Sequence, residues 1–158
     1  PAHYYTNFTY WTQHCWGVTC VNDMEAMLSY QPITIGDKEQ ALADLVRCYE
    51  KMMMRSHTNG GYVNLLDECW KMCEKFHTNI VIMYDHVSCK NVGGLHGLFE
   101  DQARERGIHL IWIPHDVMDP RTVSRREMRE AFSQYMVTVL NEKPLDPTLL
   151  DYEDALSW

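Results

Sequence analysis

The chain carries two patterns of apolar and polar residues, one with helical spacing and one typical of short buried strands. Apolar residues that recur three and four positions apart predict amphipathic helices. Short apolar runs rich in β-branched residues predict buried strands. The expected helices cover Phe8–Trp16, Asp37 to about Arg55, Tyr62–Phe76, about Val92 to Gly107, and Ser124 to about Leu140, and the expected strands cover Val18–Asn22, Ile80–Tyr84 and His109–Ile113.

Residues typical of helix ends support these boundaries. Ser124-Arg-Arg-Glu127 has the form of a capping box, and Asp37-Lys-Glu-Gln40 has the same form. Asn7 is a suitable N-terminal cap for the first helix. Gly17 and Gly107 follow the expected ends of two helices, where glycine is common because it readily adopts a left-handed backbone conformation.

Strands that alternate with helices predict an α/β domain with a parallel sheet and right-handed crossovers. The 158 residues suffice for one domain with its own core. We expect a small three-layer domain of the flavodoxin or Rossmann type with a parallel sheet of about three to four strands, one of them upstream of Pro1 in a longer parent chain. This domain should span residues 1–143, and the acidic segment 144–158 should form a C-terminal docking tail.

Charge and composition exclude several classes of protein. The net charge of −8 and the lack of a basic cluster argue against nucleic-acid binding. No apolar run approaches the roughly 18 residues of a membrane span, and no signal peptide is visible. The six cysteines contain no Cys-x-x-Cys, so neither a zinc ribbon nor a thioredoxin motif is indicated. Together with ten methionines, these thiols fit a reducing cytoplasm.

The turn after the strand Ile80–Tyr84 carries the strongest candidate chemistry. A thiol at a strand-to-helix turn faces the positive end of the helix dipole, which favours the thiolate that binds metals or attacks electrophiles. The two glycines that follow leave room for a bulky group beside the backbone. Alternatively, Cys89 is a half-buried loop thiol and the glycines serve packing; the residues alone leave both interpretations open. The turn holds His86, Ser88, Cys89 and Lys90, followed by Gly93 and Gly94.

Other polar residues have plausible structural roles. Cys69 and Cys73 are four positions apart on the apolar stripe of a helix, so we expect them in the core rather than on a metal. The loop after the strand His109–Ile113 should share the edge of the sheet with Cys89. Its charged side chains either pair with each other and fix the loop or contact a substrate. These side chains are His115, Asp116, Asp119 and Arg121.

With His86-Val-Ser-Cys-Lys90, the Gly-Gly pair after it and Asp119-Pro-Arg121, the chain resembles the benzoyl-CoA reductase and 2-hydroxyacyl-CoA (2-hydroxyglutaryl-CoA) dehydratase family. The resemblance covers nearly all of the chain and places it in the C-terminal domain of a family subunit. It includes the aromatic opening, the Trp-Gly-Val entry to the first expected strand, and the closing Asp-Ala-Leu-Ser-Trp. The Cys-Lys turn is the most specific part.

The resemblance implies a [4Fe-4S] cluster held between two domains by three cysteines. Cys89 corresponds to the last of these ligands, and the other two belong to a domain upstream of Pro1, so this chain alone should neither hold a stable cluster nor turn over. The helix N-terminus and Lys90 would lie beside the anionic cluster and tune its potential. The implied site consists of Cys89 as metal ligand, Ser88, Gly93 and Gly94 beside the cofactor, and His86 and Lys90 as catalytic groups.

The resemblance also implies partners and a reaction. A homologous subunit pairs with the chain, and an ATP-hydrolysing iron–sulfur activator delivers single electrons that reduce an acyl-CoA thioester to a ketyl-type radical. Ser88 and the Gly-Gly pair favour the reductase branch, and the dehydratase branch is the alternative. A non-catalytic assembly paralogue is a second hypothesis, motivated by the aromatic opening and tail. A flavodoxin-like binding domain is a third, weakened because Asn22-Asp23-Met24 stands where a Gly-rich phosphate loop is needed.

Overall fold

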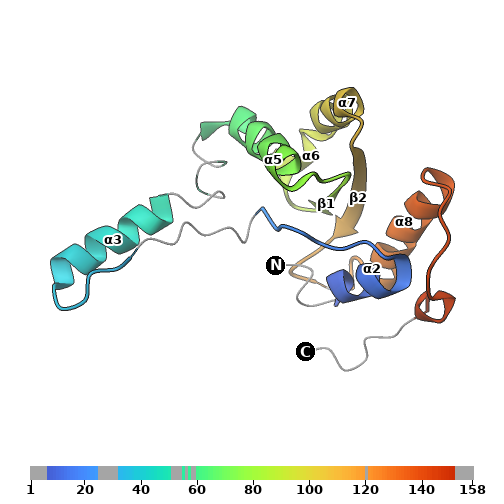
Figure 1. The fold of residues 1–158 in the computed structure, drawn as a ribbon, viewed down its shortest axis with the longest axis horizontal. Helices are drawn as coiled ribbons and strands as arrows, with labels where there is room; N and C mark the ends of the chain where they lie inside the picture. The colour runs from blue at the N-terminus through green and yellow to red at the C-terminus, as the bar shows by residue number, and fades with distance from the viewer. Residues whose placement is uncertain are drawn as a thin grey trace. The chain divides into compact units, whose positions relative to one another are not determined.

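The structure is a computed structural model that describes residues 7–24, 32–50, 55, 57, 60–119 and 121–151. Figure 1 shows the course of the chain. The chain divides into two compact units, one formed by the residues up to Val21 and from Thr78 onward, the other by Asn22–His77. We describe each unit by itself.

The first unit is built around a small parallel sheet. Strand β1 (Ile80–His86) pairs with strand β2 (His109–His115) along their whole length, from Ile80 opposite His109 to His86 opposite His115 (Figure 1). Both strands extend beyond the predicted Tyr84 and Ile113. The predicted α/β class with a parallel sheet is confirmed, but the sheet has two strands among the described residues instead of about three to four.

The predicted strand Val18–Asn22 is wrong, because its first residues complete the end of a helix. Helix α2 (Phe8–Trp16) ends at Gly17, whose φ is 74°, and the Gly17 N–H donates to the carbonyl of Gln13. The Val18 N–H donates to the carbonyl of Thr12 over 3.1 Å. The bond from Gly17 to Gln13 is the one found in an αL-type helix end, and the bond from Val18 reaches one carbonyl further back. Residues 17–23 have no regular secondary structure.

Helices α2 and α8 (Arg125–Thr138) pack on one face of the sheet. Strand residues alternate between the two faces, so Ile111 and Ile113 point to this face and the intervening residue points away. Phe132 from α8 is 0 % exposed, and its ring lies 5.7 Å from each of the rings of Phe8 and Trp11, measured between centroids. The buried core cluster comprises Phe8, Trp11, Cys15, Trp16, Ile111, Ile113, Met128, Phe132 and Met136.

The capping box predicted for α8 is confirmed. The Glu127 N–H donates to Ser124 Oγ over 3.2 Å, and the Ser124 N–H donates to the Glu127 carboxylate over 2.7 Å. The predicted cap at Asn7 is wrong in its mechanism, because Asn7 adopts a left-handed conformation and makes no side-chain capping bond. The helix it precedes forms nevertheless, because the aromatic face of the helix packs into the core.

Two helices cover the other face of the sheet, where one had been predicted. Helix α6 (Lys90–Gly93) is a single turn, and α7 (His96–Arg106) follows after a break at Gly94 and Leu95. Phe99 and Ala103 of α7 are buried, and Gly107 ends the helix with a φ of 66°. The break aims α7 at β2, where the ring of Phe99 packs edge-on against Trp112.

The described part of the C-terminal segment lies against α2. A 3₁₀ turn, η1 (Pro147–Leu149), follows α8 after a short loop. The Leu145 N–H donates to the carbonyl of Cys15 over 2.7 Å, and the indole N–H of Trp11 donates to the carbonyl of Leu149 over 2.8 Å. The start of the predicted docking tail therefore packs on its own chain.

The described residues of the second unit include helices α3 and α5. Helix α3 (Lys38–Glu50) begins where predicted, and the Gln40 N–H donates to the Asp37 carboxylate over 3.1 Å. Residues 51–54, which the prediction included in this helix, lie outside the described residues. Helix α5 (Tyr62–Phe76) buries Cys69 and Cys73 on its apolar stripe, as predicted. Among the described helices, none is both long and apolar enough to cross a membrane.

Candidate functional site at the carboxyl end of the sheet

The Cys89 turn connects the carboxyl end of β1 to α6. The Cys89 N–H donates to the carbonyl of His86 over 2.8 Å, and the Gly93 N–H donates to the carbonyl of Cys89 over 3.0 Å. Cys89 is partly exposed and immediately precedes α6. Because α6 has a single turn, the dipole that faces the thiol is that of four residues and not of the long helix expected from the sequence.

His86 connects this turn to the loop after β2. Its Nδ1 lies 3.1 Å from the Ser88 N–H nitrogen, and its Nε2 lies 3.2 Å from the Val117 N–H nitrogen. A neutral imidazole has one nitrogen lone pair, so it accepts one of these two hydrogen bonds at a time. Both nitrogens face backbone donors of the protein. The geometry therefore supports His86 in holding two loops together, and its predicted catalytic role remains a prediction.

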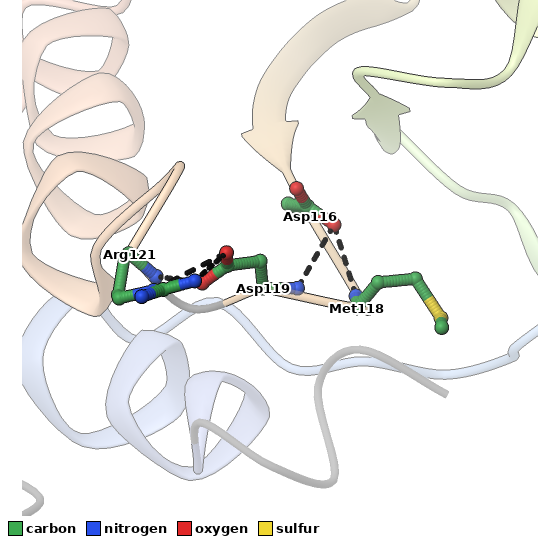
Figure 2. Close-up of polar contacts among 4 residues, drawn as sticks. All are labelled: Asp116, Met118, Asp119 and Arg121. Atoms are coloured by element: carbon green, nitrogen blue, oxygen red, sulfur yellow. Dashed lines mark hydrogen bonds and ion pairs between the residues drawn. The ribbon is translucent and has the colours of Figure 1, made fainter.

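The loop after β2 is fixed by its own charged side chains (Figure 2). Asp116 Oδ1 accepts hydrogen bonds from the N–H groups of Met118 and Asp119, and the bond from Met118 is the main reason that the pKa of Asp116 is lowered. Arg121 donates to Asp119 through Nη2 at 2.7 Å and through Nε at 2.9 Å. This pairing lowers the pKa of Asp119. Of the two interpretations left open by the sequence, the geometry favours loop fixation.

His115 ends β2 opposite His86, on the face covered by α2 and α8. Its side chain is buried, and the centroids of the two imidazole rings lie 5.7 Å apart. Burial lowers the pKa of His115, and the neighbouring His86 lowers it further, so the neutral imidazole is favoured. Its Nε2 has no hydrogen-bond partner among the described residues.

A second group of side chains, missed by the sequence analysis, lies on the opposite face of the same strand ends. Nε2 of His96, the first residue of α7, lies 3.3 Å from Asp85 Oδ1 on β1. The ring of His96 stacks on Trp112 of β2, with the centroids 3.7 Å apart and the planes 18° apart. Strand alternation was the available signal for Asp85, because it places this residue on the face opposite His86. The position of His96 depends on the break before α7, which the sequence did not reveal.

The remaining predicted residues are at the surface of the turn. Ser88, Lys90, Gly93 and Gly94 are all exposed. A Cβ atom placed on Gly93 would meet only Asp85 Oδ1, at 3.9 Å, whereas one placed on Gly94 would lie 3.2 Å from the carbonyl oxygen of Lys90. Gly93 therefore leaves room for a small group in contact with Asp85, and Gly94 permits a tight turn of the backbone.

The described residues by themselves do not form a complete iron–sulfur site. No three metal-binding side chains gather anywhere in the described part of the chain. Cys15 is enclosed in the core, where burial raises the pKa of its thiol and so disfavours the thiolate that binds metals. Because iron–sulfur clusters are held by several thiolates, the partly exposed Cys89 fits one ligand position and leaves the others to be filled from elsewhere.

A surface depression of about 420 Å³ lies at the other end of β2. Its lining includes Arg104 of α7, His109 of β2 and Tyr135 of α8. Since β2 begins at His109 and ends at His115, this depression is separated from the Cys89 turn by the length of the strand. The depression therefore does not contribute to the candidate site.

The fold and the site define a class of protein, a small α/β domain with a thiol, histidines and carboxylates at the carboxyl end of parallel strands. A family model described as 2-hydroxyglutaryl-CoA dehydratase, D-component, matches residues 1–136. The chain therefore belongs to this family, which forms part of dehydratase enzyme complexes and implies a partner subunit. Searches among curated proteins and among solved structures found no match.

Proposed function

We propose that this chain forms the C-terminal domain of an iron–sulfur subunit that acts on acyl-CoA thioesters, with Cys89 as one thiolate ligand of a [4Fe-4S] cluster. The observation that carries the proposal is the family match over residues 1–136, which includes the whole Cys89 turn. The partial exposure of Cys89 and the room at Gly93 are compatible with a group beside the turn.

The chain's own residues would support such a ligand in distinct ways. His86 holds the turn against the loop after β2, and exposed Lys90 adds a positive charge next to the thiolate. Ser88, Gly93 and Gly94 would line the space beside the cofactor. A bound cluster would supply single electrons at low potential, and its other thiolates would come from outside the described residues.

Two reactions are consistent with this family. The first is a reaction of the benzoyl-CoA reductase type, in which an acyl-CoA thioester is reduced by single electrons in an ATP-dependent process. It is supported by the resemblance of Ser88 and the Gly-Gly pair to the reductase branch. The match to a dehydratase D-component supports dehydration of a 2-hydroxyacyl-CoA as the second candidate. Either reaction would use a homologous partner subunit and an ATP-hydrolysing iron–sulfur activator in the cytoplasm.

A non-catalytic assembly role is the alternative from a different class. The observation that favours it is that, among the described residues, Cys89 belongs to no group of three or more side chains that could together hold a metal. In that case Cys89 would serve packing, and the fold would be retained for subunit pairing.

The experiment that tests the proposal measures iron and sulfide content and the EPR spectrum of the complete complex, purified without oxygen. The parent, Cys89→Ala and Cys20→Ala are compared, since Cys20 is an exposed cysteine of the same unit. We expect about four irons per cluster in the parent and the Cys20 variant, and their loss in Cys89→Ala. A Cys89→Ala complex with full iron content contradicts the ligand role, and a parent without iron supports the assembly role.

A further inference from the structure

Three histidines lie at the carboxyl end of the sheet, and they differ in what their ring nitrogens face. Both nitrogens of His86 face backbone N–H groups, and His115 is buried between rings. The side chain of His96 is 35 % exposed, and its Nε2 faces the Asp85 carboxylate at 3.3 Å. Among these three, His96 is the one with a ring edge available to a ligand.

The ring of His96 is held in a defined orientation. Stacking on Trp112 fixes the plane of the ring, and Asp85 selects which edge points toward β1. Nε2 and Oδ1 are close but not aligned as a hydrogen bond. Such contacts are often loose before a ligand binds and tighten in the complex. With Nε2 directed at the carboxylate, Nδ1 is the ring nitrogen that does not face Asp85.

Exposed glycines lie close to His96 in the sequence on both sides, and the one side chain between them and His96, Leu95, is buried in the fold. Gly93 and Gly94 precede it in the turn, and Gly97 follows it, with no atom within 4 Å of the position that a Cβ on Gly97 would occupy. The Gly93 N–H bonds to the carbonyl of Cys89, so this open stretch is continuous with the Cys89 turn. A ligand bound at the turn would therefore lie close, along the chain, to the partly exposed ring of His96.

We propose that His96 transfers a proton to or from an acyl-CoA ligand bound at the Cys89 turn, with Asp85 as its positioning residue. The inference rests on the proposed function and adds a catalytic residue to the same site. In the forward direction, a proton leaves the ligand, the bonding electron pair stays on the ligand, and the proton binds the Nδ1 lone pair. Asp85 then faces the cationic imidazolium across Nε2–H, and the reverse transfer restores the neutral ring.

The first test uses modification of histidines by diethylpyrocarbonate, which needs no turnover. The intact complex is treated with and without 2-hydroxyglutaryl-CoA as the probe, and each modified histidine is located by mass spectrometry. We expect His96 to react faster than buried His115 and to be protected by the thioester. Exposed His14, whose Nδ1 bonds to the carbonyl of Tyr10, should react equally with and without the probe. A His96 that is unreactive, or reactive but unprotected, overturns the proposal.

The second test compares turnover of 2-hydroxyglutaryl-CoA in complexes that retain their iron. His96→Gln should lower kcat by about a hundredfold or more with a much smaller change in KM, and Asp85→Asn should lower kcat less. Added imidazole should restore part of the turnover of His96→Ala, which a purely structural role does not predict. His14→Gln should match the parent.

Iron content separates the failure of this inference from failure of the proposed function. If the His96→Gln complex keeps its iron and its turnover equals that of the parent, the proton-transfer role of His96 is overturned, and the role of Cys89 as a ligand is unaffected. A parent complex without iron contradicts the proposed function instead, and unprotected His96 in that complex overturns the inference as well.

Discussion

The two faces of the β1–β2 sheet end differently at its carboxyl edge. On the face covered by α2 and α8, the strands continue from a buried apolar core into His86 and His115, which are held by the protein itself. On the face covered by α6 and α7, Asp85 near the end of β1 and Trp112 in the middle of β2 hold the partly exposed ring of His96. The sheet therefore presents packed side chains on one face and a partly exposed histidine ring on the other.

The largest expected effect tests the packed face. Phe132→Ala should reduce the free energy of unfolding by about 3–5 kcal/mol, because the ring is fully buried among other aromatic rings. Urea unfolding followed by tryptophan fluorescence measures the change. Leu98→Ala on α7 is the control, since Leu98 is 42 % exposed and should cost far less. Equal losses in the two variants would mean that the α2/α8 face is not the principal core.

A smaller effect is expected where the C-terminal segment closes the packed face. Trp11→Phe removes the indole N–H that donates to the carbonyl of Leu149, and should reduce the free energy of unfolding by about 1–3 kcal/mol. The same urea experiment measures it, with Tyr10→Phe on the exposed side of α2 as the control. The same substitution can be made in a chain that ends before η1 and so lacks Leu149. If Trp11→Phe reduces the free energy of unfolding of this shorter chain by as much as it does in the full chain, the lost stability does not come from the hydrogen bond to Leu149.

Loss of the α8 capping box should be smaller still. Ser124→Ala removes the hydroxyl that accepts the Glu127 N–H, and should cost about 1 kcal/mol. Because α8 packs on the core face, this cost should appear in the global unfolding transition. Ser124→Asp retains an N-terminal cap and should restore most of the stability. If Ser124→Ala lowers the helix content of the folded protein but leaves the midpoint of urea unfolding unchanged, α8 frays independently of the core.

The smallest effect is the pH dependence of stability that comes from the buried His115. The pKa of His115 in the folded protein is lowered from 6.5, chiefly by burial, so the unfolded chain binds the proton more readily. Its contribution to stability is therefore complete well above the unfolded pKa of about 6.5 and declines as the pH falls through and below that value. His115→Gln should flatten this part of the stability curve relative to the parent. His57, whose pKa is also lowered by burial, contributes equally to both proteins. Identical slopes in the parent and the variant would contradict the assignment to His115.

Helices α8 and α3 show why local patterns predict an element better than they predict its environment. Both helices begin where their capping residues stand, because a cap acts within one turn. The apolar face of α8 is buried in the core. In α3, Leu45 and Val46 are about half exposed, and the buried residue is Asp44, which accepts hydrogen bonds from Thr34, Gln40 and Arg47.

The sequence by itself determined helices α2, α5 and α8, the start of α3, the two strands of the sheet, the capping box of α8 and the turn that presents Cys89. Hydrophobic spacing, capping residues and turns act over a few neighbouring positions.

The tertiary structure decided the rest of the site, because the rest depends on contacts between distant segments. His86 reaches Val117 across 31 positions, and the stacking of His96 on Trp112 requires α7 to break from α6 and pack on β2. Val18 likewise completes the end of α2 instead of forming a strand, because its N–H bonds to the carbonyl of Thr12 and its side chain packs on the core.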